Sequence, residues 1–342
     1  MTDSRAISFR FLSQEDVIAC GGLDARATIA AVETALQLLA GGNCVEPPVS
    51  LLHWGEPHRR RMTAHLAYVG GEIDAAGIKW IGSNPDNPDR IGMPRATGFF
   101  ALTDPATGHP LAIMDGTVIS AMRTGAVVGA AARRLVQGEP RTVAVIGAGV
   151  IARTQLLALC AALPTLARAV VFDVDRARTA RFVEDLAPEL GLQFEIVKTA
   201  RDATQDAEIV APATNVGTHE RYIERSWLKP GAFLANVSLN DYRPDVVEAC
   251  ARIVVDTREQ LNVRGLLLAD MVADADLDPA IVDELGSLLC GDPGHVRQGD
   301  FTMFSPIGLG IEDVINAHRI YQEAARTQVG QMLRLWNAPI WC

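Results

Sequence analysis

A short apolar run followed by a pair of glycines most constrains how this chain can fold. Residues 143–146 are all apolar, which is typical of a strand buried on both faces of a sheet. Gly147 and Gly149 follow at once, and residues 150–162 read as a helix that stops before Pro164. A buried strand, a tight glycine turn and a helix in this order predict the first βαβ unit of a doubly wound parallel sheet.

The same turn has the features of a dinucleotide-binding loop. Gly147 permits the tight turn, Gly149 lets the backbone approach a pyrophosphate, and Ala152 allows close packing of the helix on the strand. The helix N-terminus offers free N–H groups and a positive dipole end to phosphates. A second buried strand ends at Asp173, near the spacing expected for a ribose ligand. This acid favours NAD over NADP, two nearby arginines leave NADP open, and a doubly wound sheet without a nucleotide is the alternative.

Length and composition exclude several classes of function. The 342 residues are enough for two domains, and a net charge of −10 gives no support to a nucleic-acid partner or an anionic membrane surface. The six cysteines are scattered, without disulfide or zinc spacing, which fits thiols in a reducing cytosol. No signal-peptide core or membrane-length apolar run is present. We therefore expect a cytoplasmic globular protein.

The first 120 residues predict an α+β unit rather than more parallel winding. Ser13–Asp16 forms a capping-box pattern before a short helix, and Asp24 can cap a second helix that stops at Gly41. Strand-like segments joined by turn sequences follow, at residues 49–53, 62–69, 75–82, 98–103 and 110–114. Consecutive strands with short turns imply a largely antiparallel or mixed sheet. A helix over residues 118–135 then leads to the nucleotide domain.

From Arg141 onward, strands and helices alternate, as parallel winding requires. The later strands are expected at residues 193–197, 207–211, 232–237, 253–256 and 301–304. A long amphipathic helix over residues 308–327 follows the last strand and can return to the first domain. We therefore predict a discontinuous substrate-binding domain, residues 1–124 and 314–342, around a Rossmann NAD-binding domain, residues 125–313.

Polar side chains follow two neighbouring strands of the predicted parallel sheet. Ligands of such sheets bind beyond the carboxyl ends of the strands. Thr214 follows one strand, and Ser238, Asn240 and Asp241 follow the next. Asp241 is therefore a candidate acid beside the nicotinamide. Its alternative role is a turn residue or a cap before Pro244.

Two cations in the first domain are candidate substrate ligands. Lys79 lies in the predicted strand over residues 75–82, and its alternative is a solvated lysine. Arg123 is the only Lys or Arg between Arg95 and Arg133, and small residues that allow tight helix packing follow it. Its planar guanidinium suits a substrate carboxylate or the cofactor phosphates. An interdomain salt bridge is the alternative for Arg123.

Other residue types offer weaker signals. The basic run Arg59–Arg61 is typical of a solvated surface. The seven histidines have no metal-ligand spacing, so no metal site is predicted, and His65 and His109 are expected to be structural. Ser120 and Ser305 lie in no nucleophile elbow and have no evident His–Asp partners.

Five segments that occur together carry a family resemblance: residues 77–83, 104–111, 120–124, 147–149 and 236–241. In this order they resemble the ornithine cyclodeaminase/μ-crystallin family over nearly the whole chain. Residues 79–88 and 304–313 most resemble its 2,3-diaminopropionate synthase branch, the N-(2-amino-2-carboxyethyl)-L-glutamate dehydrogenases of siderophore and antibiotic pathways.

The resemblance implies a role for each matching position. Lys79 and Arg123 would hold the substrate carboxylate, Asp241 would be the acid/base beside the nicotinamide, and Arg61 matches a basic position of the diaminopropionate branch. Family members are usually dimers through the N-terminal sheet, which implies a homodimer. The NAD site would be lined by Thr124, Gly147, Ala148, Gly149, Val150, Ile151, Asp173, Ala213, Thr214 and Ser238.

The resemblance also implies a reaction. The glutamate Cα–H of N-(2-amino-2-carboxyethyl)-L-glutamate would pass as hydride to NAD⁺, and hydrolysis of the imine would give 2-oxoglutarate and 2,3-diaminopropionate. Cyclodeaminases place a glutamate where Thr63 stands and an arginine at about Pro48, which counts against ornithine cyclisation. An ornithine or lysine cyclodeaminase, an amino-acid dehydrogenase or ketimine reductase, and a nucleotide-binding protein without turnover remain alternatives.

Overall fold

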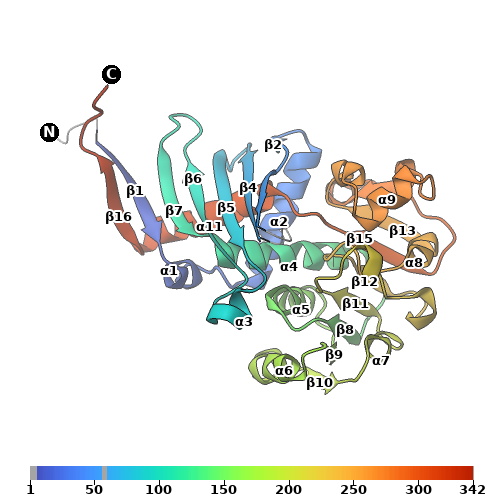
Figure 1. The fold of residues 1–342 in the computed structure, drawn as a ribbon. Coiled ribbons are helices and arrows are strands. Elements are labelled where there is room, and N and C mark those ends of the chain that lie inside the picture. Colours follow the sequence, from blue (N-terminus) through green and yellow to red (C-terminus); the bar gives the residue numbers. More distant parts are fainter. Residues whose placement is uncertain (1–5, 56–59, 342) are drawn as a thin grey trace. The chain divides into compact units, whose positions relative to one another are not determined.

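The computed structural model describes residues 6–55 and 60–341, which form two compact units (Figure 1). Unit 1 comprises Met1–Arg123 and Leu309–Cys342, and unit 2 comprises Thr124–Gly308. The first boundary falls inside helix α4 (Gly116–Leu135). The second lies five residues before the predicted edge at 313/314, because helix α11 (Gly310–Thr327) belongs to unit 1 from its first residue. The predicted fold class, a Rossmann sheet with a discontinuous α+β domain, is confirmed.

Unit 1 is built on a mixed sheet with the strand order β16-β1-β7-β6-β5-β4-β2, in which β3 also pairs with β4. Strands β1 and β7 are parallel and the other neighbours are antiparallel, as the short turns predicted. The strands are β1 (Ile7–Leu12), β2 (Cys44–Val45), β3 (Ser50–Trp54), β4 (Arg60–Val69), β5 (Ala75–Ser83), β6 (Ala96–Thr103), β7 (Pro110–Asp115) and β16 (Gln331–Trp336).

Helix α11 covers the centre of this sheet. It lies against β4, β5 and helix α2 (Figure 1), and its apolar face includes the buried Val314, Ile315 and Ile320. Its first turn contacts β5, where Asp313 pairs with Lys79. The remaining helices of unit 1 are α1 (Gln14–Ala19), α2 (Ala25–Ala40) and α3 (Asn87–Ile91), and the caps expected at Ser13 and Asp24 are confirmed.

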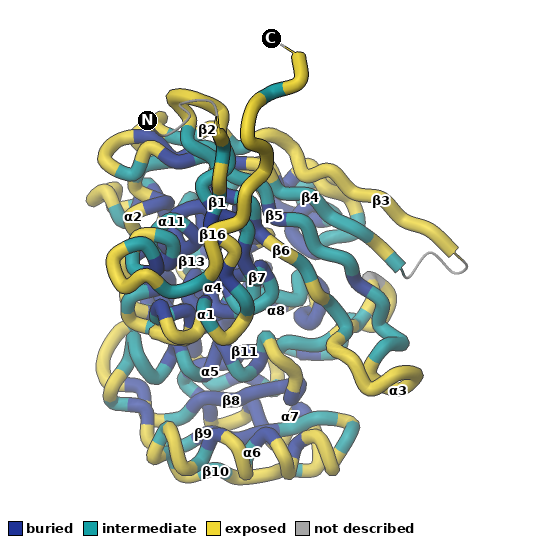
Figure 2. Tube along the Cα trace, turned by 90° about the vertical axis from the view of Figure 1, so that its left-hand side faces the viewer, coloured by how far each residue is buried: buried dark blue, intermediate teal, exposed yellow. Residues whose placement is uncertain are grey.

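Two outer strands of unit 1 expose apolar side chains. Every residue of β3 and β16 is exposed (Figure 2), including Leu51, Trp54, Leu335 and Trp336. Strand β16 pairs with β1, so residues 7–11 and 331–336 lie side by side. Strands β1 and β16 were not predicted, although residues 7–11 alternate apolar and polar side chains.

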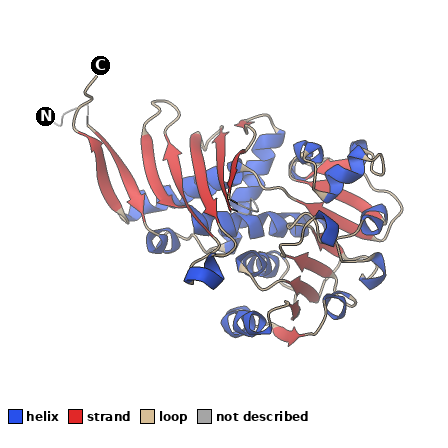
Figure 3. Ribbon diagram, viewed as in Figure 1, coloured by secondary structure: helices blue, strands red, loops and turns tan. Residues whose placement is uncertain are grey.

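Unit 2 is an eight-stranded parallel sheet with the order β10-β9-β8-β11-β12-β15-β13-β14 (Figure 3). The chain winds outward from β8 through β9 to β10 and then continues on the other side at β11. The switch point between β8 and β11 is where such sheets bind ligands. The strands are β8 (Thr142–Ile146), β9 (Arg168–Phe172), β10 (Gln193–Ile196), β11 (Ile209–Pro212), β12 (Phe233–Ala235), β13 (Cys250–Val255), β14 (Val282–Glu284) and β15 (Phe301–Ser305).

Helices flank this sheet and bury its central strands, β8 and β11 (Figure 2). A Cβ atom at Gly125 of α4 would clash with the backbone of Thr154 in α5, which explains the small residues after Arg123. Strand β14 and the short helices near it were not predicted. The helices are α5 (Val150–Ala162), α6 (Arg176–Leu190), α7 (Ala200–Thr204), α8 (Pro244–Glu248), α9 (Leu267–Ala273) and α10 (Leu285–Leu289), with short 3₁₀ turns between some of them.

Candidate active site

The turn between β8 and α5 has the geometry of a phosphate-binding loop. Gly147 has φ +94°, and a Cβ there would lie 2.6 Å from the carbonyl oxygen of Ala213. Gly149 is the N-cap of α5 and contributes no side-chain acceptor, while a Cβ there would meet no heavy atom within 4 Å. The protein itself therefore requires Gly147 to be glycine, and leaves open space over Gly149 at a helix N-terminus. This arrangement fits a pyrophosphate.

Asp173 fastens the glycine turn to the end of β9. Its Oδ2 accepts the N–H of Ala148 at 2.7 Å, and its Oδ1 accepts the N–H of Asp175 at 2.8 Å. The guanidinium of Arg178 lies 4.0 Å from Oδ2 of Asp173 and 3.6 Å from Oδ2 of Asp175. A carboxylate has about four acceptor positions, so Asp173 can also accept a ribose hydroxyl. The residues of this turn fit NAD, with the acid at the ribose position.

The ends of β11 and β12 bring three predicted residues together. Asp241 is fully buried, and its Oδ1 accepts hydrogen bonds from the hydroxyls of Thr214 and, at 3.2 Å, Tyr222. The N–H of Thr214 donates to Ser238 Oγ at 2.9 Å. Among the described residues, the buried Oδ2 of Asp241 has no hydrogen-bond partner. Tyr222 was missed, because nothing in its local sequence indicates which loop lies over Asp241.

The surroundings of Asp241 favour its protonated form. Burial raises the pKa of Asp241 above its usual value, and the neighbouring hydroxyls of Thr214, Ser238 and Tyr222 oppose that rise. Burial and the charge of Asp241 also raise the pKa of Tyr222, so the phenol stays protonated. A carboxyl group with a raised pKa is suited to take up and return a proton.

The turn that carries Asp241 is strained and held by polar contacts. Leu239 has φ +69°, a left-handed conformation that is unfavourable for a branched side chain. Asn240 donates to the carbonyl of Gly265 at 2.9 Å and accepts two N–H bonds from Arg221. Arg221 in turn pairs with Asp270 at 2.7 Å. These contacts fix the backbone on either side of Asp241.

Unit 1 contains a buried cluster of two cations and two acids. Lys79 is 1% exposed, and its Nζ donates to Asp313 at 2.7 Å and to Ser120 Oγ at 3.2 Å. Arg123 donates to Glu312 at 3.0 Å, and its Nε lies 3.3 Å from Asp313. The alternative of a solvated lysine is therefore wrong. Both acids that pair with Arg123 lie in unit 1, as Arg123 itself does.

Each charge in this cluster depends on the others. Burial and the charge of Arg123 lower the pKa of Lys79 to about 8, although Asp313 raises it. Burial would raise the pKa of Asp313, but Lys79 and Arg123 outweigh it and lower that pKa below its usual value. Burial and the same two cations lower the pKa of His65, which pairs with Lys79 across the strands, to about 3. His65 is therefore neutral, and the charged groups of the cluster are two cations and two carboxylates.

The sequence reasoning missed the acids of this cluster. Glu312 and Asp313 lie in the first turn of α11 and are fully buried. Two adjacent acids at the start of an amphipathic helix were the available signal, although acids there are usually solvated. Glu46 was also missed: it accepts the N–H groups of Gly310 and Ile311 at 2.6 and 3.0 Å, and burial raises its pKa to about 7.

The remaining predicted residues lie around these clusters. Arg61 is exposed on β4, and the pairs Arg61–Ser83 and His65–Lys79 place it on the same face of the sheet as Lys79. Val150 is exposed and Ile151 half-buried in the first turn of α5, and Thr124 is the first residue of unit 2. Arg59 lies outside the described residues.

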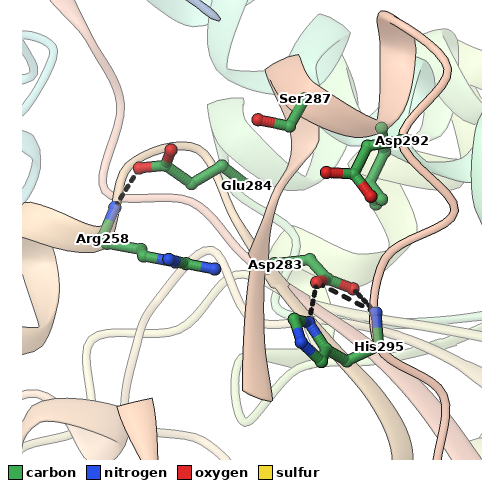
Figure 4. A pocket seen from close by; sticks show the side chains of 7 residues that line it. Arg258, Asp283, Glu284, Ser287, Asp292 and His295 are labelled. Carbon is green, nitrogen blue, oxygen red and sulfur yellow. Dashed lines mark hydrogen bonds and ion pairs between the residues drawn. The ribbon is translucent and has the colours of Figure 1, made fainter. Parts of the chain in front are cut away.

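A pocket of about 190 Å³ elsewhere in unit 2 has a different character (Figure 4). Asp283 accepts the backbone N–H of His295 at 2.8 and 3.0 Å and contacts its Nδ1 at 2.7 Å. Arg258 donates its backbone N–H to Glu284 at 2.7 Å. These contacts hold the segments at Arg258 and His295 against β14, which lies away from the switch point between β8 and β11. We assign the pocket no catalytic role.

In residues 6–55 and 60–341, no helix is long and apolar enough to cross a membrane. Within the same ranges, no group of three or more His, Cys, Asp or Glu side chains could hold a metal ion.

A doubly wound sheet with a phosphate-type turn, joined to an α+β unit with a buried cation pair, defines a two-domain Rossmann protein. Residues 10–328 match the ornithine cyclodeaminase/mu-crystallin family, and the chain belongs to that family. The match is consistent with the resemblance carried by the sequence motifs.

Individual relatives match nearly the full chain. An N-((2S)-2-amino-2-carboxyethyl)-L-glutamate dehydrogenase of Staphylococcus aureus is 33% identical over 95% of this chain and 98% of the relative. The solved Δ¹-pyrroline-2-carboxylate reductase of Thermococcus litoralis, in complex with NADH and L-proline, has a TM-score of 0.87 at 28% identity, covering 94% of this chain and 99% of that one. An archaeal alanine dehydrogenase dimer with bound NAD has a TM-score of 0.86 at 26% identity, covering 96% and 100%.

Proposed function

We propose that this protein catalyses the NAD-dependent oxidation and hydrolysis of N-(2-amino-2-carboxyethyl)-L-glutamate to 2,3-diaminopropionate and 2-oxoglutarate. The chain is an NAD-dependent oxidoreductase that acts on the CH–NH bond of an amino-acid substrate, as its relatives are. The observation that carries the choice of substrate is the 33% identity, over 95% of the chain, to a dehydrogenase of that substrate. The product would serve as a siderophore or antibiotic precursor.

Geometry in unit 2 supports the redox part of this proposal. The loop at Gly147–Gly149 fits a pyrophosphate, and Asp173 fits a ribose hydroxyl. The chemistry that NAD⁺ supplies when bound is acceptance of a hydride. Asp241 contributes a buried oxygen, Oδ2, that can take a proton from an amine or from water. Its raised pKa suits that exchange.

Geometry in unit 1 supports recognition of an acidic substrate. Lys79 and Arg123 are two buried cations held in place by Asp313 and Glu312, and we assign them to the substrate carboxylate at the reacting carbon. The substrate carries three carboxylates, so it needs further cations. Arg61 lies on the same sheet face as Lys79 and is our candidate for a second carboxylate.

A direct assay tests the proposal. Purified protein, NAD⁺ and N-(2-amino-2-carboxyethyl)-L-glutamate should give NADH absorbance together with stoichiometric 2,3-diaminopropionate and 2-oxoglutarate. Asp241→Asn is the matched inactive control. Absence of NADH with folded protein and authentic substrate would contradict the proposal.

Parallel reactions with other amines separate the alternatives. Proline formed from ornithine at constant NADH would identify a cyclodeaminase, and NADH formed from alanine would identify an amino-acid dehydrogenase. Binding of NADH without turnover of any amine would identify a nucleotide-binding protein. The residues at two positions, Thr63 and Pro48, support the first proposal over ornithine cyclisation.

We also propose a homodimer formed through unit 1. The exposed apolar side chains of β3 and β16 are typical of a surface that a partner covers. One chain has a mass of 36.7 kDa, and light scattering on the purified protein should give twice that mass. A double substitution of Leu51 and Trp54 by Ser should shift that mass toward the monomer.

A further inference from the structure

The Asp241 carboxyl group is held by only one of its two oxygens. Oδ1 accepts hydrogen bonds from Thr214 and Tyr222, whereas the buried Oδ2 has no partner in residues 6–55 and 60–341. A buried carboxylate oxygen without a donor is costly unless it carries a proton or meets a ligand. The two oxygens are therefore chemically different.

We propose that Tyr222 is a positioning residue for the acid–base step: together with Thr214 it fixes Oδ1 of Asp241 and leaves Oδ2 as the oxygen that exchanges the proton. This inference deepens the proposed function and rests on it, because it takes Asp241 as the acid/base. It assigns a role to a phenol that no motif of the sequence singled out.

The backbone around Tyr222 makes it a rigid support. The N–H groups of Tyr222 and Ile223 both donate to the backbone carbonyl of Asp241 at 3.0 Å. The N–H of Arg243 donates back to Ile223 at 3.0 Å, so the two segments are bridged. The ring of Tyr222 packs against the apolar core of unit 2. The phenol hydroxyl therefore has little freedom and stays directed at Oδ1.

Thr214 holds the same oxygen from the end of β11. Its backbone N–H donates to Ser238 Oγ at 2.9 Å, which fixes the residue while its hydroxyl donates to Asp241. Two donors from the connection between β11 and β12, one at its start and one further along, converge on Oδ1, so the carboxyl group is anchored on that side. Oδ2 is the atom left to react.

The groups around Asp241 are neutral donors. The hydroxyls of Thr214, Ser238 and Tyr222 lie around it. The Tyr242 hydroxyl donates to backbone carbonyls instead, and Asn240 accepts from Arg221, which pairs with Asp270. Burial raises the pKa of Asp241, and the hydroxyls oppose this by stabilising the ionised form. Removal of the Tyr222 hydroxyl should therefore raise that pKa further.

Oxidation of the amine removes a hydride from the carbon and releases the N–H proton to solvent, which leaves the neutral imine. The hydrolysis of that imine uses Oδ2 twice. Oδ2 takes a proton from water as the water oxygen bonds to the imine carbon, and passes it to the imine nitrogen. It then takes the hydroxyl proton of that adduct and passes it to the same nitrogen. In this second step the C–N bond breaks and the C=O bond forms, so Asp241 ends in its starting state.

The test compares Tyr222→Phe with Tyr242→Phe. Tyr242 is a neighbouring buried tyrosine whose hydroxyl lies 3.2 and 3.3 Å from the backbone carbonyls of Val210 and Ala235, so its removal is a matched control. The acid limb of the pH profile of kcat/KM should move up by about one pH unit in Tyr222→Phe, since a hydrogen bond to a charged group is lost. Below the limb, kcat/KM should be about tenfold lower. The limb of Tyr242→Phe should stay at its wild-type position.

A second readout does not need turnover. Infrared difference spectra of ¹³C-aspartate-labelled protein, with Asp241→Asn as the reference, follow the titration of the Asp241 carboxyl itself. Its midpoint should rise in Tyr222→Phe and not in Tyr242→Phe. An unchanged midpoint in Tyr222→Phe, or a uniform loss of kcat with an unmoved limb, overturns the inference. Wild-type protein that gives no NADH would overturn the proposed function instead.

Discussion

Two fully buried aspartates of this protein are handled in opposite ways. Asp313 in unit 1 lies between Lys79 and Arg123, and its pKa is lowered below the usual value despite burial. Asp241 in unit 2 has only neutral hydroxyl donors, and burial raises its pKa. Two aspartates that are buried to the same extent thus have pKa values shifted in opposite directions. Partner chemistry, and not burial alone, decides between the two.

This difference suits two kinds of task. A carboxylate that stays charged keeps its cations in place and oriented toward a substrate anion. A carboxylate whose pKa is raised can take up and return a proton during a reaction. In the function that we propose, unit 1 supplies positioning and unit 2 supplies acid–base chemistry.

Asp241→Asn tests the catalytic half of the comparison and has the largest expected effect. Turnover with the amine substrate should fall by about 10²–10⁴-fold, because a proton-transferring group is lost. The free energy of unfolding should not fall, since a neutral amide costs less to bury than a carboxylate. NADH formation and urea unfolding measure the two quantities. Wild-type turnover in this variant would contradict the assignment of Asp241 as the acid/base.

Asp313→Asn should produce the opposite pattern, with stability as the main loss. Removal of one partner leaves Lys79 and Arg123 buried with less compensation, which should lower the free energy of unfolding by about 3–5 kcal/mol. Urea unfolding at neutral pH measures this loss. Glu323→Gln on the same helix breaks an exposed pair with Arg326 and should change little. Equal effects of the two variants would show that the buried pairing is unimportant.

Lys79 links the cluster to substrate affinity through pH. Its pKa of about 8 means that the ammonium is charged below pH 8 and lost above it. KM should therefore rise above that pH, by up to about tenfold for each pH unit. Lys79→Arg keeps its charge at every working pH, so its KM should lose this alkaline rise. A rise of the same size in both proteins would assign it to another group.

Arg61 extends the comparison to an exposed cation, for which the smallest effect is expected. Arg61→Gln should raise KM for the tricarboxylate substrate by about two- to fivefold, since exposed charge pairs contribute little. Arg60→Gln, one residue away and on the opposite face of β4, is the control and should leave KM unchanged. Steady-state kinetics on both variants would measure the difference. An equal effect of both substitutions would show that only general charge matters.

Much of the fold could be predicted because its signals are local. Helix α5 has the bounds expected from its glycine start and proline stop, and strand β8 was expected from its apolar run. Strand β1 was missed although residues 7–11 alternate apolar and polar side chains, whereas its pairing with β16, far away in the chain, has no local signal. The second segment of unit 1 begins at Leu309, five residues before the predicted start at 314, because α11 lies against the sheet of unit 1.

Some residues of the candidate site could also be predicted from local signals, and others could not. The positions of Asp241, Thr214 and Ser238 follow from the rule that ligand-binding residues come after parallel strands, and the structure brings the three together. Tyr222, Glu312 and Glu46 belong to no such rule. Each reaches its partner from another element of the fold, so its contacts depend on how the chain packs.

The amino-acid sequence by itself determined the class of fold and the phosphate-type turn, and it predicted Asp241, Lys79 and Arg123 as candidate site residues. These depend on periodicity, glycine geometry and residue type, all of which are local properties. Only the tertiary structure decided how those charges behave. Lys79 is buried against Asp313, and Asp241 meets only hydroxyls, because residues far apart in the chain are packed together. A pKa is set by neighbours in space, and the sequence names the group without naming its neighbours.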